Sequence, residues 1–255
     1  MRTSLLSVLF IYLLLFTQLG FAENNLQELK ENLGRQLYFD KNLSLKRTQS
    51  CASCHDPATG FVDATNNASE RAASLGDNGK SLGDRSAPTS SYANQIPHFH
   101  KNKEGNYIGG QFWDGRASTL KDQAAGPPLN SGEMAMPNEQ AVVDRLLENP
   151  SYIDMFKSVY GKGIFQHAKY TYEAMTDAIA AFEQTDFFSP FDSKYDRHLR
   201  GDYDLTKQEE LGKTLFFSQQ FTNCNQCHQL KTSPISEGET FSDYSYHNIG
   251  VPTNK

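Results

Sequence analysis

Two C-x-x-C-H motifs carry the most specific chemistry in this sequence, and together they use all four of its cysteines. The first is Cys51-Ala-Ser-Cys54-His55 and the second is Cys224-Asn-Gln-Cys227-His228. This spacing is the attachment signature of c-type haem, in which two thiols add to the porphyrin vinyl groups and the adjacent histidine ligates the iron. We therefore predict two covalently bound haems c, with His55 and His228 as axial ligands.

Two other kinds of site also use C-x-x-C pairs. A structural zinc ion needs four ligands within a short span, whereas these two pairs lie far apart and each has its own histidine. A disulfide or a thioredoxin-like redox pair would leave the repeated histidine unexplained. Haem attachment is therefore the better interpretation of both motifs.

The first 22 residues have the features of a secretory signal peptide. Arg2 gives a positive start, residues 5–16 are nearly all apolar, and Gly20-Phe21-Ala22 offers a cleavage site. The apolar run is short for a membrane-spanning helix, which needs about 20 residues. We expect cleavage, no permanent membrane anchor and a periplasmic location, because covalent haem attachment takes place outside the bacterial cytoplasm.

The 255-residue chain has a formal net charge of −6 and contains no cluster of lysine and arginine. Such a chain is not suited to binding nucleic acid. A basic electron-transfer protein is a better match for its charge, although net charge does not locate a docking surface.

The two halves of the sequence repeat one pattern. Residues 33–39 (LGRQLYF) precede the first motif and residues 211–217 (LGKTLFF) precede the second, both with apolar residues at helical spacing. We expect a duplicated unit of helix, short loop and C-x-x-C-H. The predicted fold is mostly α, with two cytochrome c-like haem domains in tandem, over residues 23–190 and 191–255.

Other helices are expected over residues 117–125, 139–147 and 170–184. A further helix should begin near Thr206, because Glu209 completes a capping box there. Residues 63–94 are rich in Gly, Ser, Asn and Ala, which predicts a long loop. Long loops inside compact domains tend to be functional or disordered.

Four further segments accompany the haem motifs. They are Phe112-Trp113-Asp114-Gly115-Arg116-Ala117, Gln123-Ala-Ala-Gly126-Pro127, Gly132-Glu133-Met134 and Tyr246-His247-Asn248-Ile249-Gly250. With both motifs, they make most of the chain after residue 22 resemble the bacterial di-haem cytochrome c peroxidases and the related MauG proteins.

The resemblance implies that the N-terminal haem reacts with peroxide and that the C-terminal haem receives electrons. By position in the motifs, Gln123 and Glu133 correspond to the family's catalytic pair, and Trp113 to the tryptophan between the haems. A carboxyl group can take a proton from one peroxide oxygen and return it to the other, and an amide can orient the peroxide. Partial burial should raise the pKa of Glu133, which suits this role.

Taken singly, these three residues have plainer interpretations. Glu133 would be a solvated loop residue, Gln123 an exposed helix position and Trp113 a core residue. Their fixed spacing beside two haem motifs favours the functional interpretation.

The sequence departs from the family pattern in the long loop. Asp77 stands where several members have a histidine that blocks the first iron, and aspartate is a poor haem ligand; we therefore expect a first haem open to peroxide without reductive activation. His98 and His100, nearby, are interpreted as surface histidines. Ser86 replaces the asparagine that binds the family's interdomain calcium, which disfavours calcium here.

The sequence ends at Lys255, before the region in which family members carry the distal ligand of the second haem, so we expect a truncated C-terminal domain. Met134 and Met136 lie beside the first site's motif and are poor substitutes. We expect His247 to make a structural hydrogen bond rather than to ligate iron.

The leading hypothesis is therefore an enzyme that reduces hydrogen peroxide to water, with electrons from a small redox protein, either a cytochrome c or a cupredoxin. The second is MauG-like oxidation of side chains on a partner protein, which the absence of a blocking histidine favours. The third is a non-enzymatic di-haem electron carrier, against which Gln123 and Glu133 argue. A homodimer is compatible with all three.

Overall fold

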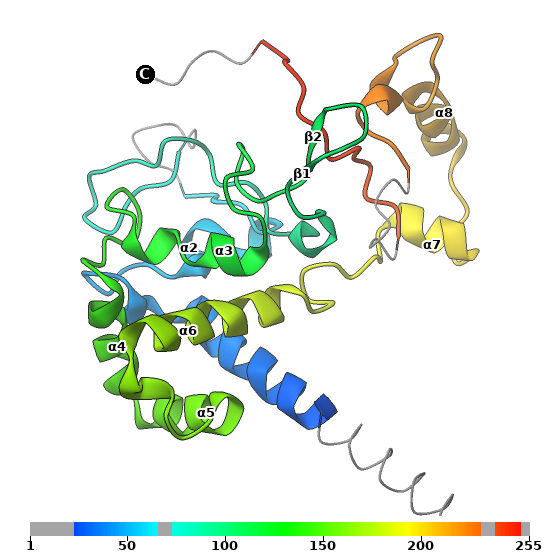
Figure 1. Cartoon of the computed structure of the whole chain (residues 1–255). Coiled ribbons are helices and arrows are strands. Elements are labelled where there is room, and N and C mark those ends of the chain that lie inside the picture. Colours follow the sequence, from blue (N-terminus) through cyan, green and yellow to red (C-terminus); the bar gives the residue numbers. More distant parts are fainter. Residues whose placement is uncertain (1–22, 66–72, 231–237, 251–255) are drawn as a thin grey trace, which may run out of the picture.

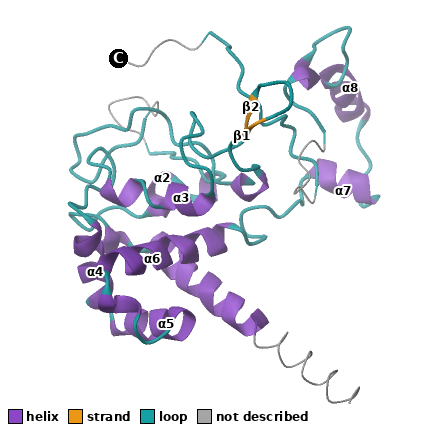
Figure 2. Cartoon of the chain, in the orientation of Figure 1, coloured by secondary structure: helices purple, strands orange, loops and turns teal. Residues whose placement is uncertain are grey.

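The structure is a computed structural model that describes residues 23–65, 73–230 and 238–250. The expected signal peptide, residues 1–22, lies outside them. Helices make up most of the regular structure in the described residues, which confirms the mostly α prediction (Figure 2). No helix of this part of the chain is both long and apolar enough to cross a membrane.

After an opening helix over residues 23–39, the α-helices are α2 (Cys51–Cys54), α3 (Leu120–Ala124), α4 (Glu139–Leu147), α5 (Pro150–Tyr160), α6 (Ala168–Glu183), α7 (Lys194–Arg200) and α8 (Lys207–Phe216). Short 3-10 helices are η1 (Lys41–Leu43), η2 (Pro57–Thr59), η3 (Ala93–Gln95), η4 (Pro127–Leu129), η5 (Ile164–Gln166) and η6 (Cys224–Gln226). Strands β1 (His100–Lys101) and β2 (Tyr107–Ile108) form an antiparallel hairpin.

Helix α6 is the centre of the larger lobe, where it packs against α3 and α4 (Figure 1). The helix over residues 23–39 crosses α6 so closely that a Cβ on Gly34 would overlap the carbonyl group of Ala178. Glycine is the residue type that permits such a backbone approach. Sequence and packing are thus directly linked at this crossing.

An aromatic cluster fills the space beside this crossing. Tyr38 packs edge-on against Phe182 and Phe188, with ring centroids 5.6 and 5.3 Å apart. Tyr38 and Phe188 have no exposed surface. Burial of each such side chain contributes about 1.5–3 kcal/mol, so this cluster holds the helix over residues 23–39 against the end of α6.

The helices expected from the sequence are present with small shifts. Helix α4 has the predicted bounds, and α6 begins two residues before the predicted start. Thr206 caps α8 as expected, since its hydroxyl accepts a hydrogen bond from the Glu209 N–H and its own N–H donates to the Glu209 carboxylate. The described part of the long loop contains no α-helix before η3.

Helix α3 is shorter than predicted. The Gln111 N–H donates to the Ala117 carbonyl at 2.7 Å, which holds Ala117 in an extended bridge. The helix starts only after Thr119, whose hydroxyl accepts from the Asp122 N–H at 3.1 Å. The capping box of Thr119 and Asp122 thus starts the helix at Leu120, and the residues before it are not helical.

Helices α5 and α7 and the β1–β2 hairpin were not anticipated from the sequence. Helix α5 has a clear start signal, because the Asn149 side chain accepts from the Ser151 N–H at 3.0 Å and Pro150 follows the cap. The hairpin is only two residues long in each strand, which is too short for an alternating pattern to show.

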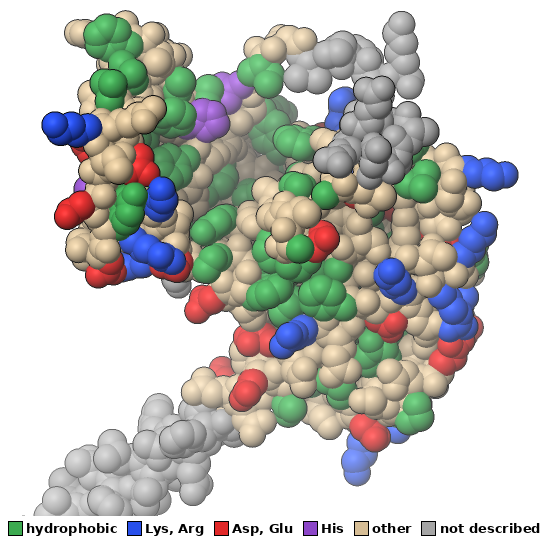
Figure 3. Space-filling model, turned by 180° about the vertical axis from the view of Figure 1, so that it is seen from behind, with side chains coloured by type: hydrophobic (Ala, Val, Ile, Leu, Met, Phe, Trp, Pro, Cys, Tyr) green, Lys and Arg blue, Asp and Glu red, His purple; other side chains and the backbone are tan. Residues whose placement is uncertain are grey.

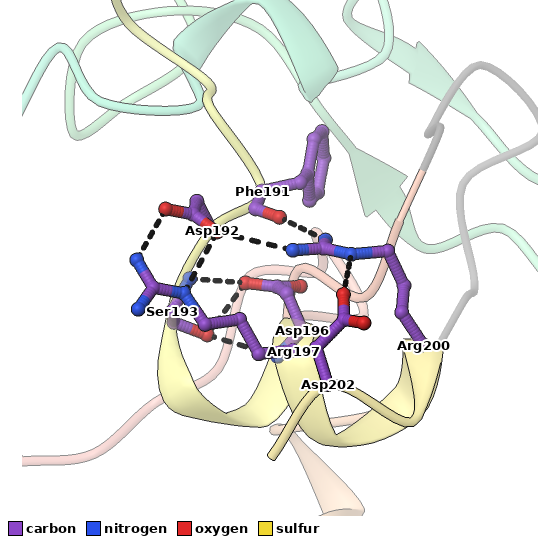
Figure 4. Close-up of polar contacts among 7 residues, drawn as sticks. All are labelled: Phe191, Asp192, Ser193, Asp196, Arg197, Arg200 and Asp202. Carbon is purple, nitrogen blue, oxygen red and sulfur yellow. Dashed lines mark hydrogen bonds and ion pairs between the residues drawn. The ribbon is translucent and has the colours of Figure 1, made fainter.

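A smaller lobe carries α7 and α8 and is joined to α6 by residues 184–193, where the predicted domain boundary falls (Figure 1). Polar contacts fix the end of this link (Figure 4): Arg197 and Arg200 both pair with Asp192. The segment after the second motif returns to the larger lobe, where the Gly109 N–H donates to the Tyr244 carbonyl at 2.9 Å.

The two sequence repeats differ in their packing. Leu33 in the first repeat is fully buried, whereas Leu211 in the second is 58 % exposed. Gly212, the counterpart of Gly34, has no heavy atom of the described residues near the position of a Cβ. The described residues therefore cover the apolar face of the first repeat and leave that of α8 open.

Candidate functional site

A cavity of about 590 Å³ lies between α2, α3, the end of α6 and the loop before β1. Cavities of this size hold cofactors and other small molecules. Its lining brings together every N-terminal site residue predicted from the sequence, namely Cys51, Cys54, His55, Trp113, Gln123 and Glu133.

The first motif forms a single helical turn at one wall of this cavity. Ser50 precedes α2, and its N–H donates to the Ser53 hydroxyl at 3.0 Å. The His55 N–H donates to the Cys51 carbonyl at 3.0 Å, which closes the turn. Both cysteines and the histidine therefore face one space, as attachment to a single haem requires.

A contact with a backbone carbonyl fixes the tautomer of His55. Its Nδ1 lies 3.3 Å from the Phe61 carbonyl, which can only accept, so Nδ1 carries the proton. In this tautomer Nε2 has the lone pair, the usual arrangement of a metal-ligating histidine, and the Pro88 carbonyl also lies near the ring. Burial lowers the pKa of His55 and keeps the ring neutral.

None of the four cysteines, all of which lie in the described residues, forms a disulfide. Burial raises the pKa of Cys54 to about 11 and also raises the pKa of Cys51. A structural zinc site needs four ligands, and the described residues contain no group of three or more His, Cys, Asp or Glu placed to hold a metal ion.

Glu133 is half-buried and lines the cavity. Burial raises the pKa of its carboxyl group, while a hydrogen bond from Asn130 and the nearby charge of Arg116 act to lower it. The Asn130 amide donates to Oε1 at 2.8 Å. The direction of the pKa shift is the one expected from the sequence, and Oε2 is the oxygen without a hydrogen bond from a described residue.

Gln123 lies on α3, near the end of the helix that Thr119 caps. Its N–H bonds to the Thr119 carbonyl at 3.0 Å. The side-chain amide makes no hydrogen bond to another described residue, yet it lines the cavity. This amide is therefore available to a molecule inside the cavity.

Trp113 is not a core residue, because 57 % of its surface is exposed. Its indole N–H donates to the Ser86 carbonyl at 2.9 Å, which fixes the ring at the cavity mouth. The preceding Phe112 has a φ of +64°, a conformation that bulky residues rarely adopt, and the Arg116 guanidinium lies 3.6 Å from the centre of its ring. Such a contact stabilises the strained turn.

The second motif lies in the smaller lobe and does not line this cavity. The His228 N–H donates to the Cys224 carbonyl at 3.0 Å, and His228 Nδ1 lies 3.1 Å from the Phe241 carbonyl. Nδ1 of each histidine thus lies next to a carbonyl oxygen and carries the proton, which leaves the lone pair on Nε2. Seen from behind, the two lobes enclose a hollow lined by apolar and histidine side chains (Figure 3).

Comparison with known proteins shows which family the chain belongs to. Residues 28–204 match the family described as di-haem cytochrome c peroxidase. The chain belongs to this family.

Two curated relatives of this di-haem peroxidase family illustrate its range. The chain is 48 % identical over 223 residues to the methylamine utilization protein MauG of Paracoccus denitrificans, covering 88 % of this chain and 57 % of that protein. It is 39 % identical over 200 residues to the cytochrome c peroxidase Ccp of Escherichia coli, covering 78 % of this chain and 37 % of that enzyme. The chain thus spans about half of these relatives or less.

The diheme peroxidase BthA from Burkholderia thailandensis has a similar structure, with a TM-score of 0.80 and 30 % identity over 88 % of this chain and 55 % of BthA. A MauG-like protein associated with microbial copper homeostasis matches with a TM-score of 0.63 and 27 % identity, over 88 % of this chain and 57 % of that one. These likenesses agree with tandem cytochrome c-like domains.

The residues of the larger cavity fit the haem c that membership of the di-haem peroxidase family implies. Two thiols and a neutral imidazole face one space, as the attachment chemistry demands. Apolar side chains from α3 and α6, Leu120 and Ile179, line the same space. A buried oxygen, Glu183 Oε2, also has no hydrogen-bond partner there.

Asp77 is directed away from this cavity. Its carboxylate accepts from the Lys46 N–H at 2.6 Å and from the Thr48 hydroxyl at 2.6 Å. Burial acts to raise its pKa, but these hydrogen bonds outweigh burial and the pKa lies below its usual range. The Asp77 N–H donates to the Glu133 carbonyl at 2.8 Å, so the loop also anchors Glu133.

The remaining candidates lie where the sequence predicts. His98 and His100 are exposed. His247 lies 2.8 Å from the Asp243 carboxylate, which is a structural contact. Met134 and Met136 are buried in the core of the larger lobe.

Two residues of the cavity were missed by the sequence analysis. Asn130, three residues before Glu133, had a detectable signal, because asparagine at this spacing commonly bonds to a nearby side chain or backbone group. Glu183 follows Ile179 by four positions on a largely buried helix, so an acidic residue on an apolar helix face was the signal there.

Proposed function

We propose that this chain contains the peroxide-reacting part of a periplasmic di-haem c peroxidase that reduces hydrogen peroxide to water. The observation that supports this most strongly is the shared cavity: the haem-attachment turn and the pair Gln123 and Glu133 face the same space. The reaction consumes two electrons and two protons for each peroxide. A small cytochrome c or cupredoxin is the proposed electron donor.

Cys51 and Cys54 hold the first haem through two thioether bonds, and His55 Nε2 ligates its iron. Haem, when bound, supplies a redox-active iron that activates the oxygen–oxygen bond. The hydrogen bond from His55 Nδ1 to the Phe61 carbonyl orients the imidazole and increases its electron donation. Cys224, Cys227 and His228 hold the second haem in the same way.

Glu133 moves the proton that peroxide reduction requires. Its Oε1 accepts a hydrogen bond from Asn130, so Oε2 takes the proton from one peroxide oxygen and delivers it to the other. Burial raises the pKa of Glu133, which brings the carboxylic acid and the carboxylate closer in free energy and suits a group that both accepts and donates a proton. The free amide of Gln123 orients the peroxide.

Trp113 connects the cavity to the protein surface and is the proposed electron relay between the haems. Its ring lines the cavity and is also exposed, and the bond to Ser86 keeps it in place. Electrons from the second haem, in the smaller lobe, would pass near this ring.

A second candidate is MauG-like oxidation of side chains on a partner protein. The exposure of Trp113 favours it, because an exposed ring can pass electrons from a partner surface inward. The orientation of Asp77 also favours it, because this residue leaves the first haem cavity without a blocking side chain. Homodimer formation stays a prediction, as does the expectation that Ser86 disfavours calcium.

Rapid mixing of the haem-loaded protein with hydrogen peroxide tests the proposal. A peroxidase or a MauG-like enzyme gives a fast spectral change in the fully oxidised protein, whereas an electron carrier gives none. Steady consumption of peroxide by a reduced small cytochrome or cupredoxin then favours the peroxidase. Fast reaction without turnover of any such donor would favour the MauG-like alternative.

A further inference from the structure

Glu183, the last residue of α6, is a buried acid that the proposed peroxide chemistry does not use. Only 6 % of its surface is exposed, and it lines the first haem cavity together with Ile179 one turn earlier. Its Oε2 is buried and has no hydrogen-bond partner among the described residues. Buried polar side chains are rarely left in this state, and this one lines the cavity whose residues fit a haem.

Among the described residues, burial is the one cause of the pKa shift of Glu183, with no contribution from a positively charged side chain. The titratable groups that face it are Tyr38 from the helix over residues 23–39 and Cys51 from α2, both neutral in the folded protein. Burial alone raises the pKa of Glu183 to about 8. The carboxyl therefore holds a proton readily inside the cavity and releases it when a positive charge lies nearby.

Glu183 differs in this respect from Glu133. Glu133 has a hydrogen bond from Asn130 and the nearby charge of Arg116, and it lies in the loop that faces α3. Glu183 has neither partner and is more deeply buried. The cavity thus contains two acids in different surroundings, which is a common way of giving two carboxyl groups separate tasks.

We propose that Glu183 takes up a proton when the haem held by Cys51 and Cys54 gains an electron, and releases the proton when that electron leaves. The inference rests on the haem site proposed above. One electron, supplied by the small donor protein through the second haem, and one proton from solvent enter together, and Glu183 changes from carboxylate to carboxylic acid. The physical reason is that reduction removes one positive charge from a cavity of low dielectric, where a carboxylate nearby is then no longer stabilised.

Binding of the electron and binding of the proton must favour each other equally. Glu183 should therefore make the reduction potential of the first haem depend on pH. The potential should fall as the pH rises through the neutral and mildly alkaline range, because fewer protons are then available to accompany the electron.

The experiment is a spectroscopic redox titration of the full haem-loaded chain at several pH values. In the wild type, the midpoint reduction potential of the first haem should shift with pH. Glu183→Gln, which keeps the shape and removes the titration, should abolish this slope. Glu173→Gln, on the exposed face of the same helix, is the matched control and should behave like the wild type. The second haem gives an internal reference, because its wave should be unaffected by Glu183→Gln.

A flat wild-type profile, an unchanged slope in Glu183→Gln, or a slope lost only in Glu133→Gln would each overturn the proposal. If Glu183→Gln does not fold, infrared difference spectra of the wild type decide the question. Reduction should create a carboxylic acid band and remove a carboxylate band, with a shifted band in Glu183→Asp, and absence of these bands would overturn it. Failure of the proposed function has a different signature: no covalent haem, or no reaction with peroxide.

Discussion

Asn130 opposes the effect of burial on the proposed catalytic acid through a single hydrogen bond. Its amide donates to Glu133 Oε1 at 2.8 Å, while its own carbonyl oxygen accepts from the Gly132 N–H at 2.9 Å. A donor to the charged carboxylate stabilises that form and lowers the pKa. Asn130 therefore opposes the effect of burial and keeps Glu133 able to act as a base.

Replacing Asn130 by Ala should raise the pKa of Glu133 further. The carboxylate then forms only at higher pH, so the rising limb of the pH–rate profile for the peroxide reaction should move to higher pH. Stopped-flow rates over a pH series measure this shift, with the exposed Asn106→Ala as a control that should leave the profile unchanged. A profile that keeps its midpoint in Asn130→Ala would contradict the assigned role.

The sequence alone identified the residues with a motif but not their surroundings. Cys51, His55 and Glu133 were chosen as candidates because fixed spacing and residue type are visible in the sequence. The exposure of Trp113 and the orphaned oxygen of Glu183 depend on how distant segments pack, which no local pattern records. Asp77 shows the same limit, because its loop position was evident but its hydrogen bonds to the turn at residues 46–48 were not.

At the scale of elements, the two helix repeats have one pattern and different surroundings. Long, periodic helices such as α4 and α6 were predicted well because their apolar faces follow the helical period. Helix α3 was predicted too long because one bridge between Gln111 and Ala117 outweighs helix propensity over its first residues. The close helix crossing at Gly34 could not be predicted from the sequence. Its counterpart Gly212 occurs in the same sequence pattern and has no close neighbour among the described residues.

Gly34→Ala should therefore destabilise the chain by about 1–3 kcal/mol or more, because the added methyl group forces two packed helices apart. Gly212→Ala is the matched control, and it should stabilise α8 by up to about 1 kcal/mol through helix propensity. Denaturation of both variants in the haem-loaded form gives the comparison. Equal effects at the two positions would contradict the packing described here.

At the scale of the whole molecule, each of the two lobes contains one C-x-x-C-H motif. The first motif, the cavity and the acids lie in the larger lobe, whereas the second motif lies in the smaller lobe and is connected by residues 184–193. Hydrogen bonds from β2 to the segment after the second motif add a second connection. Each attachment turn is closed by its own backbone hydrogen bonds, so loading of one haem should not require the other.

The double variants Cys51→Ala/Cys54→Ala and Cys224→Ala/Cys227→Ala should each retain one haem of the two. Periplasmic expression, followed by measurement of covalently bound haem per chain, should give about half of the wild-type value in both. Only the Cys224→Ala/Cys227→Ala variant should still react rapidly with peroxide in its oxidised form. Loss of both haems in either variant would show that the two sites depend on each other.

The central claim is that Glu133 transfers a proton to peroxide in the cavity of the first haem. Its most direct test is stopped-flow mixing of the oxidised, haem-loaded protein with hydrogen peroxide, comparing the wild type with Glu133→Gln and with the exposed control Glu104→Gln. Removal of a general acid–base group should slow the spectral change by about 10²–10⁴-fold, while Glu104→Gln should match the wild type. A Glu133→Gln protein that carries both haems and reacts at the wild-type rate would contradict the account.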